Sequence, residues 1–379
     1  MSKLSYLEKL LNEAKFEWKN LSDVARIKNG KDHKSLGEGK FPVYGSGGIM
    51  RYADNYAYNK SSVLIPRKGS LGNLFFVDVP FWTVDTIFYT EIDEAQIRPK
   101  YLYYFLTTVG LGDMNQAGGV PSQTQSVLNK LKIPVPCPDN PEKSLAIQSE
   151  IVRILDKFTA LTAELTAELT AELTARKKQY NYYRDQLLSF DEGEVEWKML
   201  GDLGENLDSK RKPITSGLRE AGSIPYYGAS GIVDYVKDYI FDGDFLLISE
   251  DGANLLARNT PIAFSISGKS WVNNHAHVIK FDSYAERRYV EYYLNSIDLA
   301  PYISGAAQPK LNKKNLESIR IPNPSPEDKE RIVSILDKFD ALTNSITEGL
   351  PREIELRQKQ YEYYRDLLFS FPKPETASN

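Results

Sequence analysis

The chain has 379 residues, 41% hydrophobic and 26% charged, which suits two or three folded domains and excludes a collagen-like or disordered protein. The net charge of −4 argues against a protein that coats nucleic acid by itself, so such contacts would need local basic patches or partners that add positive charge. The single cysteine, Cys137, excludes a disulfide framework and a thiolate zinc site, and it fits a reducing cytoplasm.

Residues 1–16 predict a short amphipathic helix rather than a signal peptide, because they lack a continuous apolar core. No apolar run approaches the roughly 20 residues that a membrane helix needs, so we expect no membrane contact and a cytoplasmic location. The pattern YLEKLL followed by EW resembles YRDQLL followed by EW in the middle of the chain. We therefore expect residues 1–16 to pack near the C-terminus, as the end of a repeat.

Most of the chain is present twice. Short motifs recur in the same order: EWK at Glu17 and Glu196, PVYGSGGI and PYYGASGI at Pro42 and Pro225, and ILDKF at Ile154 and Ile335. The segment RKKQYNYYRDQLLSF, residues 176–190, recurs as RQKQYEYYRDLLFSF, residues 357–371. A period near half the chain indicates duplication of a whole unit rather than a solenoid. Such a duplication predicts pseudo-two-fold symmetry, so that identical partners could bind both halves.

Residues 17–143 and 191–325 are expected to be two similar α/β domains of curved antiparallel sheet plus helices, which makes the fold class α+β. We expect strands at 62–66, 74–78, 87–91, 245–249 and 262–267, and helices at 101–107 and 287–296. Between their shared motifs the domains differ, which indicates either drift in surface loops or one scaffold that reads two different targets. Trp82 and Trp271 occupy matching positions, and we expect them in the cores rather than as stacking platforms.

Residues 144–190 predict one long helix, because they lack Gly and Pro and carry apolar residues at helical spacing. The segment LTAELTAELTAELTAR places leucines every four residues, at Leu161, Leu165, Leu169 and Leu173. A four-residue period overshoots one helical turn by about 40°, so the leucine stripe winds slowly around the helix.

Residues 326–379 contain the second long helix, in which Leu342, Ile346, Leu350 and Ile354 match the four leucines one for one. The pseudo-two-fold predicts that the two helices pack as an antiparallel coiled coil. Pro351 departs from the pattern, and it should kink the helix near Leu350 or restart it. The helices could serve only as a packing device, or they could space the two domains that they separate.

No enzyme signature stands out in the sequence. The motifs GSGG at Gly45 and GSLG at Gly69 are interpreted as turns, since neither forms a dinucleotide-binding or Walker loop. His275 and His277 have strand spacing without a further histidine nearby, so we expect no metal site. We expect a non-catalytic chain with no cofactor of its own.

Basic, amide and hydroxyl side chains near glycines recur in both domains and are candidates for DNA contact. Arg and Lys hold phosphates or read guanine, and Asn and Gln can read adenine. The alternative for each candidate is an ordinary solvated surface side chain. In the first domain the candidates are Lys31, Lys34, Ser46, Arg67, Lys68, Ser70, Asn73, Thr83 and Gln123. In the second domain they are Lys210, Arg211, Lys212, Ser230, Asn254, Asn273, Asn274, Gln308, Lys310 and Lys313.

The tandem TAEL units, the segment CPDNPEKSLAIQSEIVRILDKF before them, and the two QYxYYRD segments resemble the conserved regions of specificity subunits of type I restriction-modification enzymes, IC branch. The resemblance covers essentially the whole chain. It implies that residues 17–143 and 191–325 are target-recognition domains, each of which reads one half of a split DNA site. The helices at 144–190 and 326–379 would set the gap, and the three TAEL units suggest the longer-gap form of this branch.

The resemblance also implies partners in a bacterial or archaeal cytoplasm. Two methyltransferase subunits, which bind S-adenosylmethionine and methylate adenine, would dock on the helices. Up to two restriction subunits, which use ATP and Mg²⁺, would complete the cutting enzyme, so these cofactors are expected only in partners. Two other classes of function remain as alternatives: a scaffold whose two domains bind proteins rather than DNA, and a stand-alone enzyme, against which the lack of catalytic motifs argues.

Overall fold

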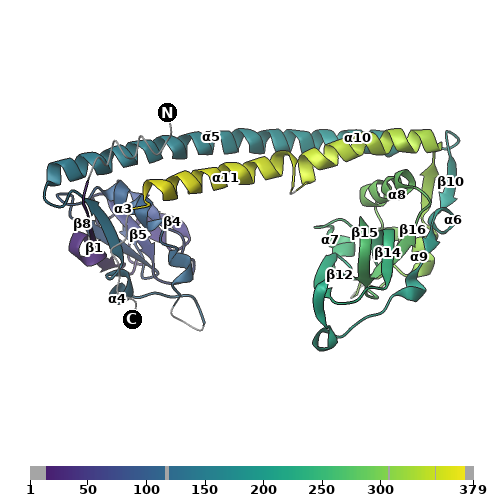
Figure 1. Cartoon of the computed structure of the whole chain (residues 1–379), viewed down its shortest axis with the longest axis horizontal. Helices are drawn as coiled ribbons and strands as arrows, with labels where there is room; N and C mark the ends of the chain where they lie inside the picture. Colours follow the sequence, from purple (N-terminus) through teal and green to yellow (C-terminus); the bar gives the residue numbers. More distant parts are fainter. Residues whose placement is uncertain (1–13, 116–118, 306–307, 346, 372–379) are drawn as a thin grey trace. The chain divides into compact units, whose positions relative to one another are not determined.

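The computed structural model describes residues 14–115, 119–305, 308–345 and 347–371, and it divides into two compact units (Figure 1). Unit 1 comprises residues 1–168 and 354–379, and unit 2 comprises residues 169–353. Each unit combines β-sheets with helices, so the predicted α+β class is confirmed. Of the helix expected at residues 1–16, residues 1–13 lie outside the described residues, and residues 14–16 are not helical, since β1 begins at Phe16.

Unit 1 contains three small sheets, with strand orders β1-β9, β2-β8-β5-β6 and β4-β3-β7. All of the pairings are antiparallel except β3 with β7, which is parallel and which no sequence pattern predicted. The strands are β1 (Phe16–Asn20), β2 (Ala25–Asn29), β3 (Glu38–Gly45), β4 (Gly48–Ala53), β5 (Ser62–Pro66), β6 (Phe75–Val77), β7 (Trp82–Thr83), β8 (Ile87–Ile92) and β9 (Lys132–Pro136). The helices are α2 (Leu21–Val24), α3 (Pro99–Leu106) and α4 (Gln125–Leu128), with parts of two longer helices described below.

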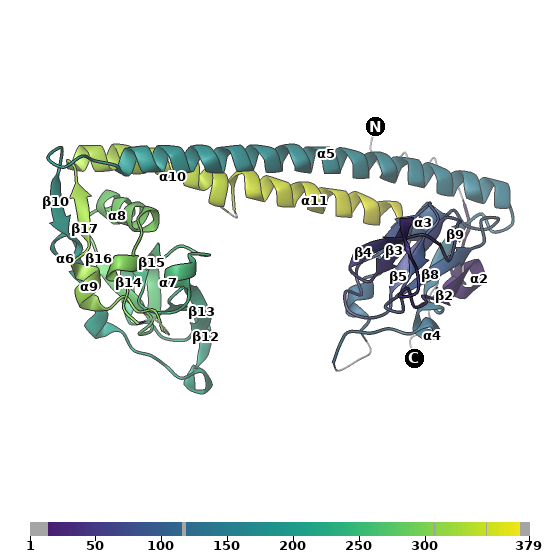
Figure 2. The same cartoon turned by 180° about the vertical axis from the view of Figure 1, so that it is seen from behind.

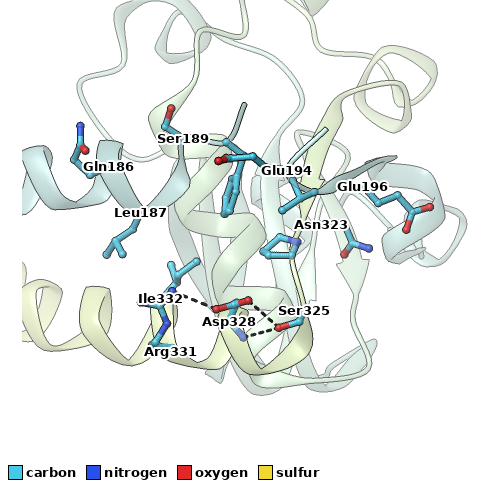
Figure 3. Close-up of a pocket in the computed structure, with 13 residues that line it drawn as sticks. Gln186, Leu187, Ser189, Glu194, Glu196, Asn323, Ser325, Asp328, Arg331 and Ile332 are labelled. Atoms are coloured by element: carbon cyan, nitrogen blue, oxygen red, sulfur yellow. Dashed lines mark hydrogen bonds and ion pairs between the residues drawn. The ribbon is translucent and has the colours of Figure 1, made fainter. Parts of the chain in front are cut away.

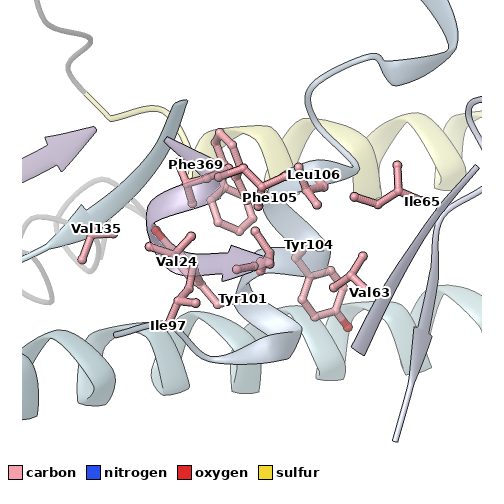
Figure 4. Packing of buried hydrophobic residues seen from close by; sticks show 14 of the residues in the cluster. Val24, Val63, Ile65, Ile97, Tyr101, Tyr104, Phe105, Leu106, Val135 and Phe369 are labelled. Carbon is pink, nitrogen blue, oxygen red and sulfur yellow. The ribbon is translucent and has the colours of Figure 1, made fainter. Parts of the chain in front are cut away.

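The core of unit 1 forms where the apolar face of α3 packs on the sheet that contains β5 (Figure 4). Tyr101 is fully buried, and its hydroxyl donates a hydrogen bond to the carbonyl of Pro134, 2.8 Å away. The C-terminal segment closes this core, because Phe369 packs edge-on against Tyr101. Phe371 stacks on Phe16 with 4.3 Å between ring centroids, so segments from the two ends of the chain meet in this unit.

Unit 2 repeats the same strand order in a single six-stranded sheet, β11-β16-β14-β15-β12-β13, beside the pair β10-β17. One long strand, β15, occupies the place of both β6 and β7. Pro80, which lies between β6 and β7, has no N–H for a ladder and accounts for the interruption in unit 1. The strands are β10 (Glu196–Met199), β11 (Glu205–Asn206), β12 (Ala221–Gly228), β13 (Gly231–Val236), β14 (Phe241–Ser249), β15 (Ala263–Val272), β16 (Ala276–Lys280) and β17 (Arg320–Asn323). The helices are α6 (Leu200–Leu203), α7 (Asn254–Ala257), α8 (Tyr284–Ser296) and α9 (Lys313–Glu317).

The five strands and two short helices predicted from periodicity are confirmed as β5, β6, β8, β14, β15, α3 and α8. Their bounds shift by a few residues at the ends, as expected where fraying and tertiary contacts decide the last turn or rung. The strand β5, SVLIP, is buried along its whole length, because it lies between β8 and β6 in its sheet and packs against α3.

The predicted helix at 144–190 is observed as α5 (Pro141–Leu188), 48 residues long. Asn140 starts it, since its side-chain oxygen accepts a hydrogen bond from the backbone N–H of Lys143. In unit 1, Phe158 of α5 stacks on Tyr364 with 5.7 Å between ring centroids. In unit 2, Tyr180 and Tyr183 of α5 contact Phe339. Both units therefore pair a part of α5 with a part of the distal helical segment (Figure 2).

The distal segment is not one continuous helix. It forms α10 (Pro326–Asn344) and α11 (Gly349–Leu368), so of the two alternatives expected near Leu350, a kink or a restart, the restart is observed. Gly349 has φ +78, and a Cβ placed there would lie 2.4 Å from the carbonyl oxygen of Ala341. The break therefore precedes Pro351, which lies in the first turn of α11, where no N–H is required.

Of the eight stripe residues, Leu161 is exposed and six are half-buried, while Ile346 lies outside the described residues. The half-buried residues are Leu165, Leu169, Leu173, Leu342, Leu350 and Ile354. The stripe is thus only partly covered within the chain, as a slowly winding four-residue period would produce.

Candidate nucleic-acid interface

Each domain has a loop that follows the central strand of its sheet and is pinned in the same way. After β5, the N–H of Arg67 donates to Thr86 and the N–H of Gly69 donates to Pro121. After β14, the N–H of Glu250 donates to His275 and the N–H of Gly252 donates to Pro309. Both glycines have positive φ, +82 at Gly69 and +104 at Gly252, which an L-residue rarely adopts. We name these segments loop 1 (residues 67–73) and loop 2 (residues 250–254).

Loop 1 gathers five of the candidates into one patch. The side-chain amide of Asn73 donates to the carbonyl of Ser46, 3.3 Å away, which joins the loop to the turn between β3 and β4. The guanidinium of Arg67 lies over the ring of Phe88, while Lys68 and Ser70 are exposed. Two adjacent cations on a glycine-containing loop suit a phosphate or a guanine edge.

The loops that precede β3 and β12 carry further exposed lysines, and matching tryptophans hold both loops. The indole N–H of Trp82 donates to the carbonyl of Lys31, and that of Trp271 donates to the carbonyl of Lys212. Both tryptophans are half-buried, so they are less enclosed than expected, and their polar edge fixes a loop in each unit. The exposed lysines of these loops are Lys31, Lys34, Lys210 and Lys212.

Three candidates are buried and shape the loops from below. Thr83, Gln123 and Asn273 are 0%, 1% and 6% exposed. The amide of Gln123 donates to the carbonyl of Pro66 at the base of loop 1, and Asn273 accepts a hydrogen bond from the N–H of His275. Their burial, which local sequence does not reveal, differs from the expected surface position: Gln123 and Asn273 bind the backbone next to the loops, and the hydroxyl of Thr83 has no hydrogen-bond partner among the described residues.

Loop 2 carries acidic residues where loop 1 carries cations. Glu250 occupies the place of Arg67, and Asp251 occupies the place of Lys68. Glu250 is buried, and its carboxylate forms ion pairs with Arg211 at 2.6 Å and with Lys310 at 3.0 Å. Burial alone would raise the pKa of the Glu250 carboxyl, but these two cations outweigh burial and hold that pKa below its usual value. Of the predicted DNA contacts, Arg211 is thus largely buried in an ion pair within the domain, whereas Lys310 pairs with Glu250 but its side chain stays 50% exposed.

The same network continues to Asp208 and His277. The Nδ1 of His277 lies 2.6 Å from Asp208, and its Nε2 lies 2.7 Å from the carbonyl oxygen of Leu311. Burial would raise the pKa of Asp208, but the hydrogen bond from His277, the N–H of Val278 and the nearby Arg211 lower it overall. Both ring nitrogens of His277 therefore lie within hydrogen-bond distance of oxygen atoms.

The oxygens of Asp208 and Glu250 and the ring of His277 approach one another closely enough to suggest a cation site. Arg211 already supplies the positive charge, since its guanidinium contacts both carboxylates. Both nitrogens of His277 are also taken by hydrogen bonds. We interpret the cluster as a structural ion network, in which His277 groups with Asp208 and Glu250 rather than with His275.

The remaining candidates of the second domain lie at or near the surface around loop 2. Asn254 is half-buried and exchanges two hydrogen bonds with the backbone of Thr260, which closes the turn after the loop. The hydroxyl of Ser249 donates to the carbonyl of Ala229, which joins loop 2 to the turn between β12 and β13. The exposed candidates here are Ser230, Asn274, Gln308 and Lys313.

Sequence reasoning missed Asp208, Glu250, Asp251, His275 and His277 as a group. A signal was available, because aligning IPRKGS at Ile65 with ISEDGA at Ile248 places two acids opposite two bases. The inward direction of Glu250 and the outward direction of Asp251 depend on contacts far apart in the sequence.

An open pocket of about 570 Å³ lies in unit 2, where α5 ends and α10 begins (Figure 3). Glu194, Glu196 and Asp328 line it, and Arg331 is paired with Asp328 at 3.2 Å. An acidic lining repels phosphates, so the loops are better candidates for a DNA surface than this pocket.

A family model described as the type I restriction modification DNA specificity domain matches the chain twice, at residues 13–175 and 192–356. The chain belongs to this family. It is a DNA-specificity subunit, the non-catalytic DNA-recognition component of a type I restriction-modification system.

The similarity to other specificity subunits extends over the full chain. The specificity subunit of the Escherichia coli enzyme EcoR124I/EcoR124II is 43% identical, with 100% of both chains covered. That of Escherichia coli EcoprrI is 38% identical over 92% of this chain and 93% of the relative. A putative specificity subunit from Haemophilus influenzae is 35% identical over 97% and 98%.

Solved structures share the fold at low identity. The specificity subunit from Mycoplasma genitalium has a TM-score of 0.52 at 17% identity and covers 96% of this chain and 98% of its own. A chain from a study of complex assembly and conformational transition of the type I system has a TM-score of 0.60 at 14% identity, with 93% and 97% covered. None of the helices within the described ranges has the length and apolar character needed to span a membrane.

In this specificity subunit, each domain is fastened to its own long helix by the same device. Lys100 and Tyr104 of α3 both contact Asp156 of α5, at 2.8 and 2.7 Å. In unit 2, Arg288 and Tyr292 of α8 contact Asp337 of α10, at 3.0 and 2.6 Å. Asp156 and Asp337 are the acidic residues of the repeated ILDKF motif, so the duplicated sequence encodes a duplicated anchor.

Proposed function

We propose that the two domains, residues 17–143 and 191–325, read the two halves of a split DNA site, and that the helices between them set the gap. One observation carries this proposal: strand order, loop pinning and helix anchors are the same in both domains, whereas the exposed charges of loops 1 and 2 are opposite. A common scaffold with different reading surfaces suits two different half-sites.

The helical segments, residues 144–190 and 326–379, would act as spacer and docking surface. Aromatic contacts of α5 with α11 in unit 1, and with α10 in unit 2, support an antiparallel coiled coil with pseudo-two-fold symmetry. Tyr182 and Tyr363 occupy equivalent places in the repeated QYxYYRD segments and are 62% and 64% exposed. Matching exposed tyrosines offer the same contact to two copies of one partner.

The partners proposed for the subunit are two methyltransferase subunits and up to two restriction subunits, in a bacterial or archaeal cytoplasm. The methyltransferases would bring S-adenosylmethionine, and the restriction subunits would bring ATP and Mg²⁺. One structural relative comes from a study of how the type I system assembles, which supports an assembly of this kind here. The acidic net charge of the chain also favours partners that add positive charge near the DNA.

Three TAEL units support the proposal that this chain belongs to the IC branch, in its longer-gap form. One unit adds four residues, which is about 6 Å of helix and close to two base-pair rises of about 3.4 Å. The four-residue step also adds about 40° of rotation, so the change in gap has to suit both distance and direction.

The test is to sequence the methylome of a restriction-deficient cell that carries this subunit with its methyltransferase, in versions with three and two TAEL units. We expect adenine methylation at a split motif whose gap shortens in the two-unit version while both half-sites stay unchanged. If the assembled complex methylates no split motif, the DNA-reading proposal fails, and a protein-binding scaffold becomes the better account.

A further inference from the structure

Loops 1 and 2 have equivalent backbone contacts but side chains of opposite charge, and one acidic side chain of loop 2 is partly exposed to solvent. Lys68 forms an isolated antiparallel bridge with Ser122, and Asp251 forms the corresponding bridge with Lys310. The backbone therefore presents Lys68 and Asp251 at the same point of each domain. A lysine in loop 1 can hold a phosphate, whereas an aspartate at that point would repel one.

The two acids of loop 2 have different surroundings. Glu250 points inward, where Arg211 and Lys310 neutralise it. Asp251 has no such cover: its side chain is 31% exposed, and His275 beside it is 50% exposed. The Nδ1 of His275 lies 3.0 and 2.9 Å from the two carboxylate oxygens, so the ring holds the carboxylate at its edge. Among the described residues only His275 contacts the Asp251 carboxylate, which leaves lone pairs for donors outside the chain.

We propose that Asp251 is a specificity-determining residue of the second domain, and that it accepts a hydrogen bond from the exocyclic amino group of a cytosine or an adenine in the major groove. The proposal rests on the function proposed above, in which this loop faces DNA. A carboxylate only accepts hydrogen bonds, and the donors that a duplex offers in its major groove are the amino groups of cytosine and adenine. Guanine and thymine present acceptors there, so the carboxylate selects against them.

The buried network explains how the carboxylate is aimed. Glu250 precedes Asp251, and its carbonyl accepts the N–H of Leu311 at 2.7 Å while its side chain holds Arg211 and Lys310. These contacts fix the backbone on both sides of the loop. Glu250 is thus a positioning residue for Asp251, and His277 supports it from the far side through Asp208.

The first arm of the test changes the protein. The methylome experiment is repeated with Asp251→Asn, with Asp251→Ala, and with the control Asp242→Asn, which replaces an exposed carboxylate elsewhere on β14. We expect both Asp251 variants to change or relax one base pair of the second half-site, with discrimination there reduced about 10- to 100-fold, and to leave the first half-site unchanged. We expect Asp242→Asn to leave both half-sites unchanged.

The second arm changes the DNA and compares the wild-type complex, assembled with its methyltransferase, with the same complex carrying Asp251→Ala. At each position of the second half-site, adenine is replaced by purine or cytosine by 2-pyrimidinone, which removes only the amino group, and binding is measured. We expect one position at which this replacement weakens binding to the wild-type complex about 10-fold or more and has no further effect with Asp251→Ala.

The outcomes separate this inference from the proposed function. The inference is wrong if the wild-type complex methylates a split motif but the Asp251 variants keep both half-sites unchanged. It is also wrong if these variants only lower methylation uniformly, because Asp251 then has only a structural role. The inference is likewise wrong if, in the binding assay, no amino-group removal weakens binding to the wild-type complex more than binding to the Asp251→Ala complex. If the wild-type complex has no split motif, the proposed function itself fails.

Discussion

Tyr101 and Tyr289 occupy the same place in the two domains, but their hydroxyl groups differ. The hydroxyl of Tyr101 donates to the carbonyl of Pro134, whereas the buried hydroxyl of Tyr289 has no hydrogen-bond partner among the described residues. Burial raises the pKa of both phenols above the usual value, so both remain protonated donors at any ordinary pH. A donor with a partner stabilises the fold modestly, and a buried donor without one costs free energy.

We expect Tyr101→Phe to lower the free energy of unfolding of unit 1 by about 1 kcal/mol, because it leaves the carbonyl of Pro134 without its donor. The matched change Tyr289→Phe should be neutral or slightly stabilising, since it removes a hydroxyl that has no partner among the described residues. Urea unfolding of the assembled complex, followed by hydrogen exchange in each unit, measures both. Equal losses in the two variants would show that the two hydroxyls have equivalent surroundings.

At the scale of elements, the repeated ILDKF motif fastens a domain helix to a long helix in each unit, but the two anchors differ in strength. The pair formed by Lys100 and Asp156 is more than a third exposed on both sides, so solvent weakens it. Asp337 is less exposed and accepts from Arg288, Tyr292 and Tyr284. Burial by itself would lower the pKa of the Arg288 guanidinium, but the nearby Glu291 and Asp337 raise it overall.

We therefore expect Asp337→Asn to destabilise the packing of α8 on α10 by about 1.5–3 kcal/mol, because it removes a charged acceptor of several hydrogen bonds. Asp156→Asn, the equivalent change in unit 1, should cost only about 0.5–1 kcal/mol. Hydrogen exchange in α8 and α3, compared with the unchanged protein, gives the two values. A larger cost at Asp156 than at Asp337 would contradict this ranking of the anchors.

At the scale of the whole molecule, the chain builds two separate cores on one repeated plan. The largest buried clusters contain α3 with the C-terminal phenylalanines in unit 1, and α8 with α10 in unit 2. Their members come from different residue ranges, although α5 and α11 each contribute to both units. Stability should therefore be local to a unit, since a lost contact affects mainly the core to which it belongs.

Leu106 of α3 and Leu294 of α8 occupy equivalent places in their helices and are both almost completely buried. We expect Leu106→Ala to lower the unfolding free energy of unit 1 by about 2–5 kcal/mol and Leu294→Ala to do the same in unit 2, through the cavity that each leaves. Hydrogen exchange resolved by peptide should show loss of protection in the substituted unit and little change in the other. Equal loss in both units for either variant would mean that the two cores unfold as one.

The sequence by itself determined the features that rest on local periodicity and on the internal repeat. The long helix α5, the five predicted strands, the helices α3 and α8, and the duplication into two domains all follow from apolar spacing and matching motifs. The restart of the distal helix near Pro351 was also foreseeable, because a proline is tolerated only in the first turn.

Only the tertiary structure decided which polar side chains face inward. Thr83, Gln123 and Asn273 were candidates for surface contact, yet they are buried beneath the loops. Arg211 was also a candidate, yet it is largely buried in ion pairs with Asp208 and Glu250, whereas Lys310 pairs with Glu250 and stays half exposed. Polar residues next to a glycine turn look the same in the sequence whether their side chains point outward or inward. The direction of each side chain depends on partners tens of residues away. The site therefore emerges from long-range hydrogen bonds and ion pairs, whereas the helices emerge from the order of residues along the chain.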